Sequence, residues 1–255
     1  MDKTLYLKAG KGDISPYVIF SGDPIRVGKI ITFMDDIREV GISREFHTYT
    51  GVYKGVEMTI SSTGIGGPSA AIAIEEMYAC GMKVAVRLGT VMGLKDDLLG
   101  NFIIPAGAMR ADGTSKTYVD TAYPAVADID VLQSMNRSAG KHGFGFDNGL
   151  VCSYDGFYSQ MRETALTDQI GIDVKKLLTD LRKINISGVD MESATILTLC
   201  RLMGIRGCVV TMTTVLENLK EYLKGNDRKQ AEEMDLVKVV LDGVVDFHGS
   251  FGDKL

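Results

Sequence analysis

The stretch Tyr17-Val18-Ile19-Phe20-Ser21-Gly22-Asp23-Pro24, residues 17–24, passes from an apolar run through a glycine turn to a proline. The apolar run predicts a short buried strand. The proline favours a helix start, because the first helical turn does not need the N–H that proline lacks. We expect this helix over about Ile25–Phe33. The segment is therefore a strand, a turn and a helix, the unit from which α/β folds are built.

The same alternation of strand-like and helical patterns continues along the chain. Val52–Ser62 alternates around Lys54-Gly55 and predicts a tight hairpin. A glycine turn at 63–69 leads into a helix that we expect to end at Gly81. Further strand-like runs lie at 84–88, 102–105, 149–153, 186–189 and 208–213, and helical patterns at 192–203 and 230–247.

This order of elements predicts the fold class. Strands that alternate with helices favour an α/β fold, here a three-layer α/β/α sandwich around a central, mixed and twisted sheet. No internal repeat, low-complexity tract or proline-rich linker divides the sequence. We therefore expect one domain spanning residues 1–255.

The composition predicts a globular protein without general affinity for polyanions. The chain is 45% hydrophobic and 24% charged, with a formal net charge of −5, so neither nucleic acid nor an anionic membrane is an expected partner. No run approaches the roughly 20 apolar residues that span a bilayer, and the polar N-terminus lacks the apolar core of a signal peptide. We expect a cytoplasmic protein that binds anions through a local cluster of cations.

Cysteine and histidine usage does not predict a metal or redox site. The four cysteines form no CxxC pair and no zinc-ligand spacing, and cysteines in apolar surroundings usually behave as small hydrophobes. The three histidines, His47, His142 and His248, lie far apart in the sequence. Neither a metal site nor a Ser-His-Asp triad is expected.

Three places offer a cation for an anionic ligand. Gly22 and Arg26 flank a predicted helix N-terminus, where free N–H groups and the helix dipole favour an anion. Arg87 and Thr90 bracket a glycine at the end of an apolar strand, and Arg44 offers a third guanidinium. The planar fork of arginine matches phosphate. Taken singly, each arginine also fits a surface ion pair, except Arg87, which needs a partner if it is buried.

Two further segments offer groups for a sugar and a base. Asp190-Met191-Glu192 follows a predicted strand. Its carboxylates either complement the dipole of the next helix or accept hydrogen bonds from the two hydroxyls of a ribose. Phe157, Gln160 and Arg162 combine an aromatic face, an amide and a guanidinium, which suits a uracil edge but also occurs on ordinary loops. The glycines of 63–69 match neither GxGxxG nor a P-loop, so alone they predict a helix-start turn.

Taken in order, these segments resemble the nucleoside phosphorylase family, which includes uridine phosphorylase and the hexameric purine nucleoside phosphorylases. The similarity runs from near the N-terminus to about Thr213, on the motifs Gly22-Asp23-Pro24-x-Arg26-Val27, Arg44-Glu45-Phe46, Ser62–Ser69, Arg87-Leu88-Gly89-Thr90, Arg110–Gly113, Tyr123–Asp128 and Met191–Thr195. Residues 63–69, residues 123–128 and the Gln160-x-Arg162 spacing resemble the uridine branch. The Ser-Asp pair with which the purine enzymes protonate the base has no counterpart in 210–215.

The resemblance implies a role for each candidate residue. It assigns Gly22, Arg26, Arg44, Arg87 and Thr90 to phosphate, Tyr6, Asp190, Met191 and Glu192 to ribose, and Phe157, Gln160 and Arg162 to the base. Of these, Arg87, Glu192 and Arg162 are the expected catalytic residues. The family forms dimers with shared sites, usually gathered into hexamers, so Arg44 is expected to reach a neighbouring subunit's site. No metal or organic cofactor is implied for the chemistry, although some members place a structural monovalent cation near positions matching Glu45, Ile65 and Ser69.

The implied reaction is reversible phosphorolysis of a pyrimidine nucleoside, with uridine and phosphate giving uracil and ribose 1-phosphate. Three alternatives stay open: a purine nucleoside phosphorylase, a hydrolytic nucleosidase, and a nucleoside-binding homologue that has lost catalysis. Two of the departures from the family pattern, at Val91-Met92 and at Glu217, keep the last one open. Tyr6 stands for a histidine and Asp190 for a glutamate, Val91-Met92 replace a small polar residue before Gly93, and Glu217 reverses a charge near the base.

Overall fold

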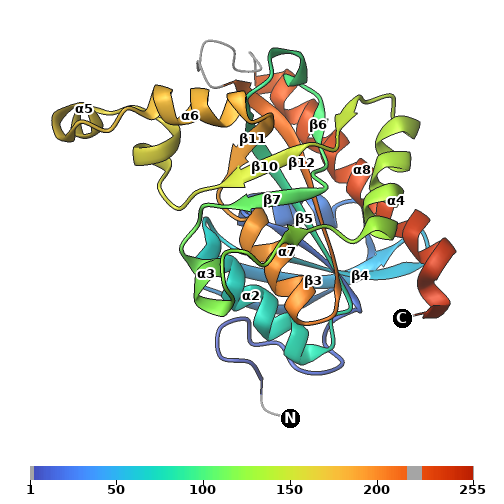
Figure 1. Cartoon of the computed structure of the whole chain (residues 1–255). Helices are drawn as coiled ribbons and strands as arrows, with labels where there is room; N and C mark the ends of the chain where they lie inside the picture. Colours follow the sequence, from blue (N-terminus) through green and yellow to red (C-terminus); the bar gives the residue numbers. More distant parts are fainter. Residues whose placement is uncertain (1–2, 217–225, 255) are drawn as a thin grey trace.

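The computed structural model describes residues 3–216 and 226–254, with side chains for all of these except 226–232 (Figure 1). The strands are β1 (Tyr17–Ser21), β2 (Asp35–Ser43), β3 (Phe46–Tyr53), β4 (Val56–Ser62), β5 (Val84–Gly93), β6 (Phe102–Ile103), β7 (Gly107–Arg110), β8 (Ala125–Val126), β9 (Phe146–Asp147), β10 (Leu150–Ser153), β11 (Ile186–Asp190) and β12 (Arg206–Leu216). The α-helices are α1 (Pro24–Ile31), α2 (Gly67–Cys80), α3 (Thr114–Tyr118), α4 (Ile129–Lys141), α5 (Ala165–Ile170), α6 (Val174–Lys183), α7 (Ser193–Leu202) and α8 (Asn226–Phe251).

The described strands form one mixed sheet centred on β5. The main order is β2-β3-β4-β1-β5-β11-β10-β7-β8, and β12 joins the sheet through β5. β5 runs parallel to β1 and β12 but antiparallel to β11. Since β1 also runs parallel to β4, the carboxyl ends of four strands meet at one edge. Loops at such an edge are the usual place for ligands in α/β folds.

Helices cover both faces of the sheet, and the alternation of side chains along the strands explains why. In β1, Ile19 packs in a core with residues of α1, α4 and α8, whereas Val18 packs with residues of α2 and α7 on the opposite face. Neighbouring residues of a strand point to opposite faces, so apolar residues at consecutive positions require cover on both sides. Figure 1 shows α2 beside α7, and α4 beside α8. The predicted three-layer α/β arrangement with a mixed central sheet is confirmed.

The predicted strand and helix positions agree with the structure, with local differences in length. The hairpin turns at Lys54-Gly55 between β3 and β4, and α2 ends at Gly81 in a left-handed conformation. β5 extends to Gly93 rather than ending at 88, because it pairs with β12 along its whole length. β6 covers only 102–103 of the predicted 102–105. No helix in residues 3–216 or 226–254 is long and apolar enough to cross a membrane.

Candidate active site

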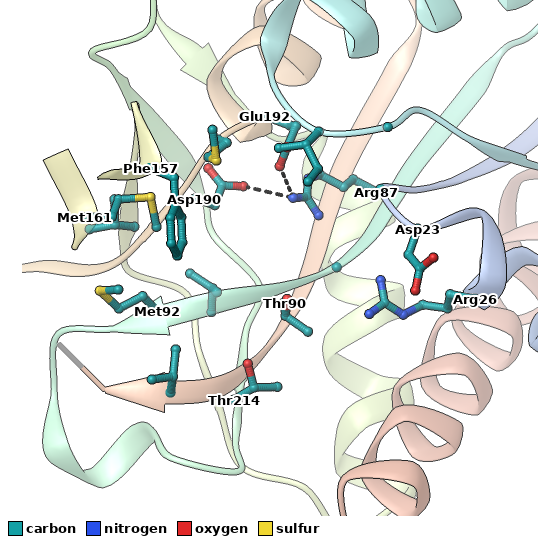
Figure 2. Close-up of a pocket in the computed structure, with 18 of the residues that line it drawn as sticks. Asp23, Arg26, Arg87, Thr90, Met92, Phe157, Met161, Asp190, Glu192 and Thr214 are labelled. Carbon is teal, nitrogen blue, oxygen red and sulfur yellow. Dashed lines mark hydrogen bonds and ion pairs between the residues drawn. The ribbon is translucent and has the colours of Figure 1, made fainter. Parts of the chain in front are cut away.

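A cavity of about 570 Å³ opens at the edge where the parallel strands end. Loops after β1 and β4, the second half of β5, and the segments after β11 and near the end of β12 line it. Eight of the twelve predicted site residues line this cavity: Gly22, Arg26, Arg87, Thr90, Phe157, Asp190, Met191 and Glu192. Figure 2 shows Arg26 on the right, Arg87 with the two carboxylates in the middle above Thr90, and Phe157 on the left.

Arg87 lies at the centre of a buried ion cluster. Its side chain is 8% exposed, and its Nη2 donates a hydrogen bond to Glu192 Oε2. The same nitrogen lies 3.6 Å from Asp190 Oδ2. Ser153 Oγ donates to the other Asp190 oxygen, at 2.6 Å. The partners that a buried Arg87 requires are thus supplied by the last residue of β11 and the segment just after it.

One arm of the Arg87 guanidinium remains available for a ligand. Its Nη1 is buried and has no hydrogen-bond partner among the residues that the structure describes. A buried donor without a partner is costly, so this nitrogen suits an anion in the cavity. The guanidinium lies over Gly89, where an added Cβ would come within 1.6 Å of Nη1. A glycine at 89 therefore permits the position that Arg87 adopts.

Burial and nearby charges shift pKa values in this cluster. Burial lowers the pKa of Arg87, but the charges of Glu192 and Asp190 outweigh it, so that the pKa is raised overall. Burial also raises the pKa of Asp190, with a further increase from Glu192, although the charge of Arg87 opposes both. Arg87 consequently stays positively charged at any physiological pH.

The loop after β1 brings the second arginine to the cavity. Asp23 caps α1, accepting a hydrogen bond from the Ile25 N–H at 2.8 Å, and Pro24 occupies the first helical turn as predicted. Arg26 follows two residues after Pro24 and is held on the side away from the cavity: its Nε donates to Glu233 Oε1 at 2.9 Å, and its Nη1 to Ser21 Oγ at 3.2 Å. The helix start and the guanidinium therefore face the same end of the cavity.

The glycine turn after β4 has a specific contact with the ion cluster. Gly66 donates its backbone N–H to Glu192 Oε1 at 2.7 Å. Its backbone adopts φ 94° and ψ 159°, a region that essentially only glycine populates. Glu192 is thus held by Gly66 on one oxygen and by Arg87 on the other. The turn that the sequence predicted as a helix start also orients a carboxylate.

We expect Gly66→Ala to weaken both the fold and the site. A Cβ at this backbone conformation should cost about 1–3 kcal/mol of unfolding free energy, and any relaxation moves the N–H that holds Glu192. Gly28→Ala is a matched control, because Gly28 is exposed within α1 and an added Cβ meets nothing within 4 Å. That control should gain about 0.5–1 kcal/mol. Urea unfolding of both variants checks this, and equal stability changes would contradict it.

The end of the cavity near Phe157 is apolar. Figure 2 shows Met92 of β5 and Met161 near Phe157. Val189 and Val215 pack with these two methionines, and Val91 also lines the cavity. Thr214 adds a hydroxyl-bearing side chain to the lining. A wall of this kind suits the flat face of an aromatic base. The sequence departure at Val91-Met92 therefore contributes directly to the lining.

Four predicted site residues do not line the cavity. Gln160 Oε1 accepts the Gly156 N–H at 3.0 Å, within the turn that carries Phe157, and Arg162 is exposed. Tyr6 and Arg44 lie together elsewhere, with the Arg44 guanidinium carbon 5.5 Å from the centre of the Tyr6 ring. The resemblance places Arg44 in a neighbouring subunit's site, and this role stays a prediction.

Some residues at the site were not singled out from the sequence. Met161, Val189, Thr214 and Val215 line the cavity, and the only signal for them was their proximity to predicted strand ends. Glu233 was missed because nothing local distinguishes it from other charged residues of a helix. Glu217, noted as a charge reversal, lies outside the described residues. Within 3–216 and 226–254, no group of three or more His, Cys, Asp or Glu side chains is placed to hold a metal ion.

Comparison with known proteins agrees with this geometry. The family model of the phosphorylase superfamily matches residues 16–239. Uridine phosphorylase from Thermococcus kodakarensis is 41% identical over 200 residues, covering 78% of this chain and 72% of that protein. Guanosine phosphorylase from Halorubrum lacusprofundi is 34% identical over 224 residues, covering 86% and 88%.

A solved structure gives the same result for the fold. The crystal structure of uridine phosphorylase from Vibrio fischeri ES114 superposes with a TM-score of 0.85, at 32% identity, over 96% of this chain and 98% of that one. The resemblance that the sequence motifs indicated is confirmed by the family match and by the identities to these relatives. The chain belongs to the phosphorylase superfamily.

Proposed function

We propose that this protein catalyses the reversible phosphorolysis of a pyrimidine nucleoside, converting uridine and phosphate into uracil and ribose 1-phosphate. The observation that carries the proposal is the order of chemical groups along one cavity. The Arg26 guanidinium lies at one end, Arg87 with the two carboxylates in the middle, and an apolar wall at the other end. Phosphate, ribose and base would lie in this same order when the two substrates meet. The uridine phosphorylases among the relatives support the choice of substrate.

The proposed reaction resembles glycoside cleavage. A phosphate oxygen attacks C1′ of the sugar while the bond from C1′ to the base nitrogen breaks, and the bonding electrons leave with the base. The transition state resembles an oxocarbenium ion, so positive charge develops on the sugar and negative charge on the base. The departing uracil anion then takes a proton from solvent. An anion fixed beneath C1′ both stabilises the sugar and attacks it.

The cavity residues divide this work between them in our proposal. Arg26 and Arg87 bind the phosphate, with the Thr90 side chain and the Gly22 turn beside them. Glu192 accepts hydrogen bonds from the ribose hydroxyls, while Asp190 and Met191 shape the same part of the site. Two features support these roles: the free Nη1 of Arg87 and the second lone pairs of the Glu192 oxygens, each of which has one partner already.

For the base we propose stacking on Phe157 and polar contacts from Gln160 and Arg162. The support is their place in one turn, Phe157–Met161 with Arg162 next. Donors aimed at the developing uracil anion lower the barrier, typically by about 3–4 kcal/mol for a well-placed one. Neither Gln160 nor Arg162 lines the cavity, so this role requires the turn to shift when a nucleoside binds.

We also propose a homo-oligomer in which two subunits complete each other's sites. Arg44 would then reach the phosphate, and Tyr6 the ribose, of a neighbouring subunit. Hexamers of such dimers, one domain per chain and a cytoplasmic location belong to the same proposal. A structural monovalent cation fits near Glu45, Ile65 and Ser69, because the Glu45 carboxylate and the Ser69 hydroxyl lie 3.0 Å apart and provide oxygen ligands. No step of the reaction depends on it.

Uridine, thymidine and inosine, each assayed with and without phosphate, test the proposal. We expect fast base release from uridine that requires phosphate and produces ribose 1-phosphate. Release without phosphate would identify a hydrolase, and binding without turnover would identify a non-catalytic homologue. A preference for inosine would identify a purine nucleoside phosphorylase. This is the second candidate function, and the similarity to a guanosine phosphorylase supports it.

A further inference from the structure

The last helix reaches back to the anionic end of the cavity through one carboxylate. Glu233 of α8 accepts a hydrogen bond from Arg26 Nε at 2.9 Å, although the two residues are 207 positions apart in the sequence. Its other oxygen contacts Lys29 Nζ. The Arg26 and Glu233 side chains are only 12% and 15% exposed. The contact is therefore sheltered from water and from screening by salt, unlike an ordinary surface ion pair.

Two fixed contacts define the plane of the Arg26 guanidinium. Nε is held by Glu233 and Nη1 by Ser21 Oγ, at 3.2 Å. Arginine has five N–H donors in a rigid fork, and among the residues that the structure describes these two contacts leave Nη2 and the second hydrogen of Nη1 for a ligand. Arg26 lines the cavity, and these remaining donors are the ones that an anion in the cavity can use.

The charges around Arg26 preserve its attraction for an anion. Glu233 alone would neutralise Arg26, but Lys29 contacts the same carboxylate, so the three side chains together carry one net positive charge. Burial raises the pKa of Glu233, but the hydrogen bonds and charges of Lys29 and Arg26 together lower it by more than burial raises it. The pKa of Glu233 therefore lies below its usual value. Glu233 is therefore ionised at neutral pH and serves as a strong acceptor.

We propose that Glu233 is a positioning residue for phosphate: it fixes the Arg26 guanidinium in the orientation that binds the anion. The proposal rests on the proposed function, in which Arg26 binds phosphate. Glu233 itself does not line the cavity, so it acts through Arg26. Helix α8 thereby contributes to the site through Arg26, without lining the cavity itself.

The direction of the effect separates positioning from simple electrostatics. If Glu233 acted only as a negative charge near the cavity, removing that charge would strengthen phosphate binding. If it positions Arg26, removing the acceptor releases the guanidinium and weakens phosphate binding. Glu233→Met removes both charge and acceptor, whereas Glu233→Gln removes the charge but keeps an amide oxygen for Arg26 Nε.

Steady-state kinetics of these variants, with phosphate and uridine varied separately, test the proposal. We expect Glu233→Met to raise the KM for phosphate about tenfold, the effect of one lost charge-assisted hydrogen bond, and to leave the KM for uridine within about twofold. Glu233→Gln should recover most of that loss. Lys29→Met removes the other cation on Glu233 but leaves the contact between Arg26 and Glu233 in place, so it should raise the KM for phosphate clearly less than Glu233→Met does.

Arg26→Ala separates failure of this proposal from failure of the proposed function. If Arg26→Ala leaves the KM for phosphate unchanged, Arg26 does not bind phosphate. If Arg26→Ala raises it but Glu233→Met lowers it or leaves it unchanged, the positioning role is wrong. In the Arg26→Ala background, Glu233→Met should add nothing, because no guanidinium remains to be oriented, and a further increase would indicate a purely structural role.

Thermal stabilisation by inorganic phosphate gives a second readout that does not require turnover. A ligand that binds the folded state raises Tm according to its affinity. We expect about 10-fold weaker phosphate binding in Glu233→Met to reduce the Tm increase relative to wild type, and we expect Lys29→Met to reduce it less. An undiminished increase in Glu233→Met would overturn the proposal even if the chain proved inactive toward uridine.

Discussion

Arg87→Ala is expected to lower kcat/KM for uridine phosphorolysis by at least about 10²–10³-fold. The reason is that Arg87 offers its free Nη1 to the phosphate, and losing one preorganised donor typically costs about 2.7–4 kcal/mol of transition-state stabilisation. Initial rates at saturating and limiting phosphate measure the effect. Phosphorolysis near the wild-type rate would show that the phosphate lies elsewhere.

The same substitution should also destabilise the fold. It leaves Asp190 and Glu192 buried without their cation, and breaking a buried pair on one side costs about 3–5 kcal/mol. The double variant Arg87→Met with Glu192→Gln is a useful control, because it removes one of the uncompensated charges and fills much of the same space. We expect it to recover part of the lost stability in urea unfolding but no activity. If this double variant recovered activity, Arg87 would not be required for the reaction.

Glu192→Gln is expected to lower kcat/KM for uridine by about 10²-fold. The amide is nearly isosteric, yet it replaces a carboxylate oxygen with a group that cannot accept. Glu192 has contacts on both oxygens, with Gly66 and with Arg87, so the substitution disturbs the ribose contact and the Arg87 position together. Comparison of kcat and KM for uridine and for phosphate measures both consequences.

2′-Deoxyuridine distinguishes the two consequences in Glu192→Gln. If Glu192 accepts a hydrogen bond from the 2′-hydroxyl, the wild-type protein already lacks that contact with 2′-deoxyuridine. Glu192→Gln should then lower kcat/KM several-fold less with 2′-deoxyuridine than with uridine. An equal loss for both substrates would mean that Glu192 acts only by holding Arg87. Gly66→Ala should show the same substrate pattern more weakly, because it affects Glu192 through one oxygen only.

Much of the fold followed from local patterns, and the exceptions have physical causes. β1, α1 and the hairpin at Lys54-Gly55 carry strong signals: consecutive buried apolar residues, a proline at a helix start and a turn glycine. β2 was not predicted because its nine residues are largely exposed and polar. Its pairing with β3 stabilises it, and pairing between strands is invisible to periodicity.

The site was partly predictable for a related reason. Most of the predicted residues that line the cavity lie at a strand end or in the segment that follows, where a short motif signals them, whereas Arg87 and Thr90 lie within β5. Gln160 and Arg162 were assigned to the base from their hydrogen-bonding groups and from the resemblance, and the folded turn directs Gln160 to Gly156 and exposes Arg162. Their role in base binding, like that of Arg44 in a shared site, stays a prediction.

The sequence by itself determined the alternation of strands and helices, the family, and the residue types available for an anion, a diol and a base, because these depend on short contiguous motifs. Only the tertiary structure decided which of those residues meet. Arg87, Glu192 and Gly66 come from three separate segments, and Glu233 joins Arg26 across 207 positions. Such contacts arise from strand pairing and helix packing, which bring distant residues together without leaving a local trace in the chain.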